Sequence, residues 1–67
     1  MLQIFINGET HEVSAGTSLA KLVEGQQLSG KRFAIEVNEE IIARSHLGEY
    51  QLRQGDRVEI VQAIGGG

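Results

Sequence analysis

Few side chains in this 67-residue sequence could do chemistry. The two histidines, His11 and His46, have no second histidine or carboxylate at metal-ligand spacing, so we interpret both as surface residues. None of the serines lies in a G-x-S-x-G nucleophile motif. Glu36, Glu39 and Glu40 could suggest a carboxylate pair, but a solvated turn is the better interpretation, because so small an interior offers nothing to raise a carboxyl pKa. Without cysteine there is no thiolate metal site or cysteine nucleophile. We therefore predict no catalytic and no metal-binding residue.

The remaining reactive group is the carboxylate of Gly67, which ends the run AIGGG at residues 63–67. Glycines have no side chain to bury and a free backbone. We therefore expect this run to stay mobile and extended over roughly 17 Å, at about 3.3–3.6 Å per residue. A carboxylate is a poor electrophile until it is activated, and ATP would convert it into an acyl-adenylate at an unhindered glycine carbonyl. We predict a globular domain over residues 1–62 and a tail on which other proteins act. A frayed end without function is the alternative.

Size and charge exclude several classes of protein. A chain of 67 residues forms one domain at most, and such a domain buries only about 60% of its unfolded surface. The net charge of −3, from 6 basic and 9 acidic residues, argues against nucleic-acid binding. The first residues lack the features of a signal peptide, and no stretch is long and apolar enough to span a membrane. We expect a cytoplasmic protein that binds no membrane.

Alternating apolar residues predict a protein rich in β-strands. The strands are expected at residues 2–6, 10–13, 33–37, 41–42 and 57–61. Turn signals separate the predicted elements, at Asn7-Gly8, Ser29-Gly30, Asn38-Glu39-Glu40 and Gln54-Gly55-Asp56. The stretch at residues 44–48 has no clean period and predicts a loop or one helical turn, after which Tyr50 and Leu52 should cover the core.

One helix is predicted between the second and third strands. Leu19, Leu22 and Val23 recur at helical spacing and form a short apolar stripe that can pack on a sheet. Thr17 could cap this helix by accepting a hydrogen bond from a backbone N–H of the first turn. Gly25 is unfavourable inside a helix, so the helix ends there or shortly beyond.

The element order predicts an α+β fold, in which a mixed sheet of about five strands carries one main helix on one face. The first and last strands are expected to form the central, parallel pair. The residues expected to face the helix are Leu2, Ile4, Ile6, Val58 and Ile60. Phe5 and Val61 then point to the outer face, as does Ala34. Together with Ala63 they could form a small apolar docking patch beside the tail, although scattered apolar surface residues are normal.

Several motifs share their residues and spacing with a known family. They are Ile4-Phe5-Ile6-Asn7-Gly8, Leu19-x-x-Leu22-Val23, Val37-Asn38-x-Glu40-Ile41-Ile42 and the segment from Leu52 through Gly55-Asp56-Arg57-Val58-Glu59-Ile60-Val61 to Gly65-Gly66-Gly67. On these motifs the whole chain resembles the ubiquitin-like sulfur carriers. Its length and triple-glycine ending are more similar to the carriers of thiamine biosynthesis than to the longer molybdopterin-synthase small subunit. The resemblance implies a β-grasp fold.

The resemblance also implies a carrier, and not an enzyme. A ThiF-type adenylating enzyme would use ATP to adenylate the Gly67 carboxylate, and a persulfide sulfur donor would replace AMP and leave a thiocarboxylate. Thiazole synthase, ThiG, would use this sulfur to build the thiazole of thiamine. No bound cofactor is implied. The residues that would enter the active sites of these partners are Ile64, Gly65, Gly66 and Gly67.

Two other functions stay open. The chain could donate sulfur to molybdopterin or to tRNA thiolation, or it could be a non-covalent ubiquitin-like interaction domain whose tail is inert. The sequence departs from the family pattern at Ala43, where many members have proline, and at Gln27, where many have glycine. Both departures concern turns, so they leave the proposed chemistry intact.

Overall fold

The computed structural model describes residues 1–26 and 32–62 of the chain. The elements within these ranges are β1 (Leu2–Ile6), β2 (Glu9–Val13), α1 (Leu19–Glu24), β3 (Phe33–Val37), β4 (Glu40–Ile42), the 3₁₀ helix η1 (Arg44–His46) and β5 (Arg57–Gln62). Some expectations concern residues outside these ranges: Gln27, the Ser29-Gly30 turn, Ala63, Ile64, Gly65, Gly66 and Gly67.

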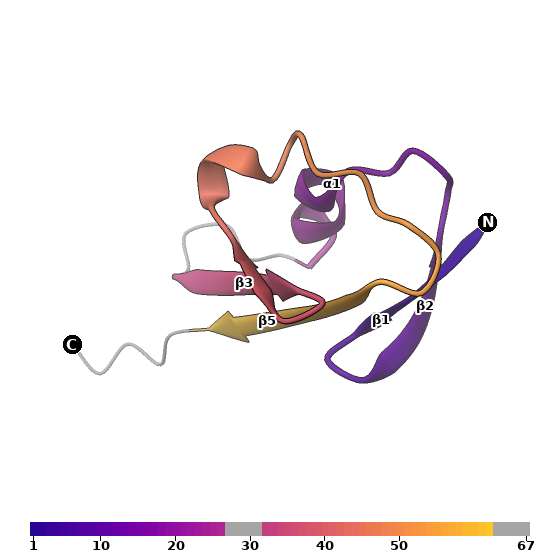
Figure 1. The fold of residues 1–67 in the computed structure, drawn as a ribbon, viewed down its shortest axis with the longest axis horizontal. Helices are drawn as coiled ribbons and strands as arrows, with labels where there is room; N and C mark the ends of the chain where they lie inside the picture. The colour runs from indigo at the N-terminus through magenta and orange to yellow at the C-terminus, as the bar shows by residue number, and fades with distance from the viewer. Residues whose placement is uncertain (27–31, 63–67) are drawn as a thin grey trace.

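The strands form one mixed sheet in the order β2-β1-β5-β3-β4. β1 and β5 are parallel neighbours at its centre, whereas the other pairs are antiparallel. Figure 1 shows α1 lying over one face of this sheet, and none of the described elements covers the opposite face. The predicted α+β architecture is thus confirmed, including the central position of the first and last strands.

Two tight hairpins set the strand register. Asn7 (φ 49°) and Gly8 (φ 86°) join β1 to β2, and Asn38 (φ 52°) and Glu39 (φ 73°) join β3 to β4. Two consecutive left-handed residues are typical of a type I′ turn, whose twist matches that of the flanking strands. Because the second turn needs only two residues, β4 begins at Glu40, one residue before the predicted start.

The start of α1 differs from the prediction. Ser18, and not Thr17, is the N-cap, and its Oγ accepts a hydrogen bond from the backbone N of Lys21 at 3.1 Å. The Thr17 hydroxyl instead donates to the carbonyl of Ser14 at 2.7 Å. The cap moves because Ser18 is still extended and pairs with Gln51 in an isolated β-bridge, so the helix cannot begin before the next residue. As expected, α1 ends at its glycine C-cap.

The segment between β4 and β5 covers one end of the core. Its first part forms η1, which confirms the predicted helical turn. The guanidinium carbon of Arg44 lies 4.2 Å from the ring centroid of Phe33, at cation–π distance. Leu47 is buried although the irregular pattern around it did not predict this. Leu52 is buried and Tyr50 packs against the core, as predicted.

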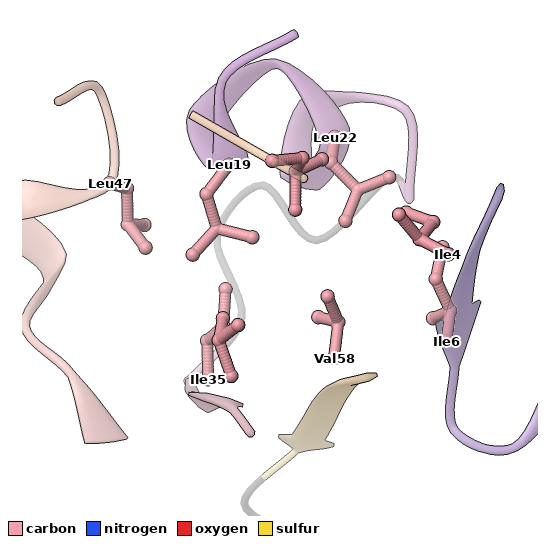
Figure 2. Close-up of a cluster of buried hydrophobic side chains, with 9 residues drawn as sticks. Ile4, Ile6, Leu19, Leu22, Ile35, Leu47 and Val58 are labelled. Atoms are coloured by element: carbon pink, nitrogen blue, oxygen red, sulfur yellow. The ribbon is translucent and has the colours of Figure 1, made fainter. Parts of the chain in front are cut away.

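The hydrophobic core lies between α1 and the inner face of the sheet. Its buried residues are Ile4, Ile6, Leu19, Leu22, Ile35, Val37, Leu47, Leu52 and Val58. In Figure 2 the side chains of Leu19 and Leu22 point from the helix toward Ile35 and Val58 on the sheet. Each such aliphatic side chain contributes about 1.5–3 kcal/mol when fully buried. Because all these residues serve packing, any functional surface has to be sought at the ends and on the outer face of the sheet.

Candidate functional site

β5 is the last described element and leads directly into residues 63–67. It lies between β1 and β3, so backbone hydrogen bonds can hold it from both sides. The candidate site therefore consists of the end of this strand next to the tail and the outer face that it shares with its neighbours, whereas the groups at its start anchor the strand.

The first end of β5 is held by Asp56, a buried carboxylate that is 6% exposed. Its oxygens accept hydrogen bonds from Asn38 Nδ2 at 3.1 Å, from the backbone N of Arg53 at 2.9 Å and from the Tyr50 hydroxyl at 3.4 Å. A buried carboxylate needs such donors to replace its lost hydration. Asn38 also accepts from the backbone N of Arg57 at 3.0 Å. One turn residue thereby ties the β3–β4 hairpin to the start of β5.

This network changes the acidity of one group. Burial raises the pKa of the Tyr50 hydroxyl above its usual value of 10.0, and the neighbouring Asp56 carboxylate raises it further. Both effects disfavour a phenolate. Tyr50 therefore stays protonated near neutral pH and donates to Asp56, which identifies it as a structural donor.

The second end of β5 is held mainly by backbone pairing with β3. Val61 is the register partner of Ala34, and Gln62 is the register partner of Phe33. On the other side of the strand, the side chain of Asn7 bonds to the backbone of Ile60, with Oδ1 accepting from its N at 2.8 Å and Nδ2 donating to its O at 3.3 Å. The end of β5 next to the tail thus lacks a buried carboxylate like the one that holds its start.

The structure brings only part of the expected docking patch together. Ala34 and Val61 are side by side, and Val61 is 55% exposed. Phe5 is half-buried and in register with Arg57, four residues before Val61 on β5, which places it about 13 Å away along the strand. Between them lies Glu59, on the same face of β5. Phe5 lines a separate hollow of about 280 Å³ beside Gly8, Arg57, Val58 and Glu59.

Sequence reasoning missed one residue of the outer face. Ile41 is 74% exposed, and its register partner Glu36 is in turn the partner of Glu59. These three side chains form a row across β4, β3 and β5 on the same face as Val61. The predicted strand at Ile41-Ile42 was too short to show alternation, so the sequence did not indicate which of the two isoleucines points inward.

The other candidate residues form no reactive cluster. His11 lies on β2 with its Nε2 3.9 Å from Glu9 Oε1, and His46 is exposed at the end of η1. Within residues 1–26 and 32–62, no group of three or more histidine or acidic side chains could hold a metal ion. In the same part of the chain, every helix is too short or too polar to cross a membrane.

A mixed five-stranded sheet with one short helix on one face defines the β-grasp class of proteins, to which ubiquitin-like domains belong. The solved structure of the thiamine biosynthesis protein ThiS from Geobacter metallireducens superposes with a TM-score of 0.82 at 22% identity, covering 98% of this chain and 100% of that one. The β-grasp expectation is thereby confirmed. The chain belongs to the ThiS family, whose model matches residues 4–67.

Curated relatives agree with this membership. The sulfur carrier protein ThiS of Escherichia coli is 26% identical over 66 residues, which cover 98% of this chain and 100% of that protein. Thiazole synthases of Magnetococcus marinus and Paramagnetospirillum magneticum are 36% and 33% identical over 98% of this chain. The chain spans only 20% of the length of each of these two synthases. The comparisons therefore agree on membership in the ThiS family.

Proposed function

We propose that this chain carries sulfur as a thiocarboxylate on Gly67 and delivers it to thiazole formation in thiamine biosynthesis. The observation that carries the proposal is the family match, which runs through the glycines to residue 67. The buried aliphatic side chains of the described residues form the core. On the strength of the family match, we assign the chemistry to the tail.

The proposed reaction sequence has three steps. The Gly67 carboxylate attacks the α-phosphate of ATP on a ThiF-type adenylating enzyme, and pyrophosphate leaves. The terminal sulfur of a persulfide donor then attacks the acyl-adenylate and AMP leaves, giving an acyl disulfide. A second thiol cleaves its S–S bond and leaves the thiocarboxylate on Gly67. This sulfur passes to a thiazole synthase of the ThiG type.

Two functional regions follow from this proposal. Ile64, Gly65 and Gly66 act with Gly67 as the stem that enters each partner's active site. The outer face supplies contacts to the partners through Phe5, Ala34, Val61 and Ala63. The pairing of Ala34 with Val61, next to the end of β5, supports such contacts beside the tail. In keeping with the sequence-based expectation, we place the carrier and its partners in the cytoplasm.

Thiazole formation is favoured over the other sulfur pathways by one observation. Two of the matched relatives are thiazole synthases that align with 98% of this chain over a fifth of their own length. A carrier for molybdopterin or for tRNA thiolation remains the second candidate. Deletion of the gene separates them, because loss of a thiazole carrier produces a requirement for thiazole that molybdopterin or modified tRNA does not relieve.

The proposal is tested by intact-mass measurement. The purified chain is incubated with its adenylating enzyme, ATP and a persulfide donor, and we expect it to gain the mass of sulfur in place of one oxygen. Removal of Gly67 should abolish this gain and leave the thermal unfolding midpoint unchanged. Gly48→Ala is the matched control, because a Cβ at Gly48 meets no atom within 4 Å, and this variant should be thiolated normally. A chain without Gly67 that is still thiolated would refute the assignment.

A further inference from the structure

We propose that Asn7 is a positioning residue, which fixes the direction in which β5 leaves the sheet toward Gly67. The inference rests on the proposed function, because a fixed exit matters only if a partner has to receive the tail. It concerns an exposed turn residue whose role in hairpin formation alone does not account for its contacts.

The side chain of Asn7 takes the place of a missing strand residue. The register between β1 and β5 covers only Phe5 with Arg57 and Ile6 with Val58, after which β1 ends. The Asn7 backbone N still donates to the carbonyl of Val58 at 2.9 Å. Beyond this point its side-chain amide accepts from the N of Ile60 at 2.8 Å and donates to the O of Ile60 at 3.3 Å. The parallel ladder is thus extended along β5 by one amide group.

Because of this extension, β5 is hydrogen-bonded on both sides near its end. On the side of β3, backbone pairing continues through Val61 and Gln62. On the side of β1, the two hydrogen bonds from Asn7 hold the N–H and C=O of Ile60. Without them, the N–H and C=O of Ile60, which both point toward β1, would lose their partners. The last two residues before the tail would then be held only by their pairing with β3. Orientation of a reacting group contributes to rate when it is fixed before the reaction.

Both the backbone and the side chain of asparagine are needed at this position. The φ of 49° is left-handed, and asparagine and glycine tolerate this region better than most residues. A primary amide also carries one acceptor and two donors, so it can bond to a peptide N–H and C=O at once. Glycine would retain the turn and lose both bonds, whereas aspartate would retain only the acceptor. These two substitutions therefore separate the role of Asn7 in the turn from its two side-chain hydrogen bonds to Ile60.

Hydrogen exchange of backbone amides tests the hydrogen bonds between Asn7 and Ile60 in the free protein. In Asn7→Gly we expect the Ile60 amide to exchange about fivefold faster relative to the Ile6 amide, since one net hydrogen bond is lost. Asn7→Asp keeps the acceptor and should leave this ratio near that of the wild type. Asn38→Gly is the matched control, because Asn38 is the equivalent residue of the other hairpin and bonds at the start of β5. It should destabilise the whole domain without raising the ratio of the Ile60 exchange rate to the Ile6 exchange rate, which we call the Ile60 ratio.

Adenylation kinetics test the positioning. With the ThiF-type enzyme we expect Asn7→Gly to lower kcat about fivefold while KM for the carrier stays within about twofold, because docking occurs and the tail is misdirected. Asn7→Asp should recover part of kcat, and Asn38→Gly should retain it below its unfolding transition. An unchanged Ile60 ratio, an unchanged kcat, or an equal loss in Asn38→Gly would each overturn the positioning role. A wild-type chain that is never adenylated would overturn the proposed function as well.

Discussion

The two ends of β5 are held by different means. At its start, the buried carboxylate of Asp56 accepts from three donors, one in the β3–β4 turn and two in the segment that precedes β5. At its end, Val61 is 55% exposed, and the side chain of the turn residue Asn7 bonds to the backbone of Ile60. Both turn residues have left-handed backbones, yet Asn38 bonds within a half-buried network whereas Asn7 bonds at the surface. From this comparison we predict that stability depends mainly on the start of the strand, and we propose that partners are contacted at its end.

The largest expected effect is at the start of β5. Asp56→Ala removes the shared acceptor and leaves its donors without that partner in a half-buried position. We expect the free energy of unfolding to fall by about 3 kcal/mol, a large share of the stability of so small a domain. Urea unfolding followed by circular dichroism measures this loss. A loss below about 1 kcal/mol would mean that the network is not where the stability of β5 resides.

A smaller effect, in binding and not in stability, is expected at the other end. Val61→Glu should weaken binding of the adenylating enzyme at least about tenfold, because a partner would have to bury a charge, while unfolding changes by less than about 0.5 kcal/mol. Ile41→Glu is a matched control on the same face but two strands away from β5, and should affect binding less. Titration calorimetry measures the affinity and scanning calorimetry measures the stability. A Val61→Glu variant that is destabilised but binds normally would contradict a docking role for the end of β5.

Phe5 tests how far the docking surface extends. It is half-buried and about 13 Å from Val61 along β5, so Phe5→Glu should cost more stability than Val61→Glu. If the docking surface is confined to Ala34 and Val61, the weakening of binding should be no larger than that of Val61→Glu. A much larger loss of binding in Phe5→Glu would place the centre of the docking surface at the hollow beside Phe5.

The smallest expected effect is a dependence of stability on alkaline pH. The pKa of Tyr50 is raised in the folded chain above its usual value of 10.0, so folding favours the protonated hydroxyl. This contribution is fully present below pH 10, the unfolded value, and is lost as pH rises through the higher folded value. Tyr50→Phe should therefore flatten the fall of the unfolding midpoint above about pH 10. An equally steep fall in Tyr50→Phe would assign the pH dependence to other groups.

The sequence predicted the sheet well because strands depend on local alternation. Ile4 and Ile6 alternate with Phe5, and the Asn7-Gly8 turn fixes the first hairpin, so the first strand pair and the facing of its residues followed from residues close in the chain. The central pairing of the first and last strands followed from the crossover rule. Thr17 was wrongly predicted as the cap because the bridge from Ser18 to Gln51 depends on a segment far along the sequence.

Parts of the candidate site could not be predicted for the same reason. Asp56 was interpreted as a turn residue, since nothing near it in the sequence shows that Asn38 and Tyr50 converge on it. The contact from Asn7 to Ile60 joins residues separated by 53 positions and involves a side chain that the turn itself does not need. Gly67 was predicted from the sequence and the family resemblance alone, because the structure does not describe residues 63–67.

The most direct test of the proposed function is to locate the sulfur on the chain. After incubation with the adenylating enzyme, ATP and a persulfide donor, the thiocarboxylate is trapped with an alkylating reagent, and the modified peptide is fragmented in a mass spectrometer. The absence of cysteine removes the competing thiol from this chain. The proposal predicts one label, on Gly67, that depends on ATP. A label at another residue, or none with an enzyme shown to be active on another carrier, would contradict it.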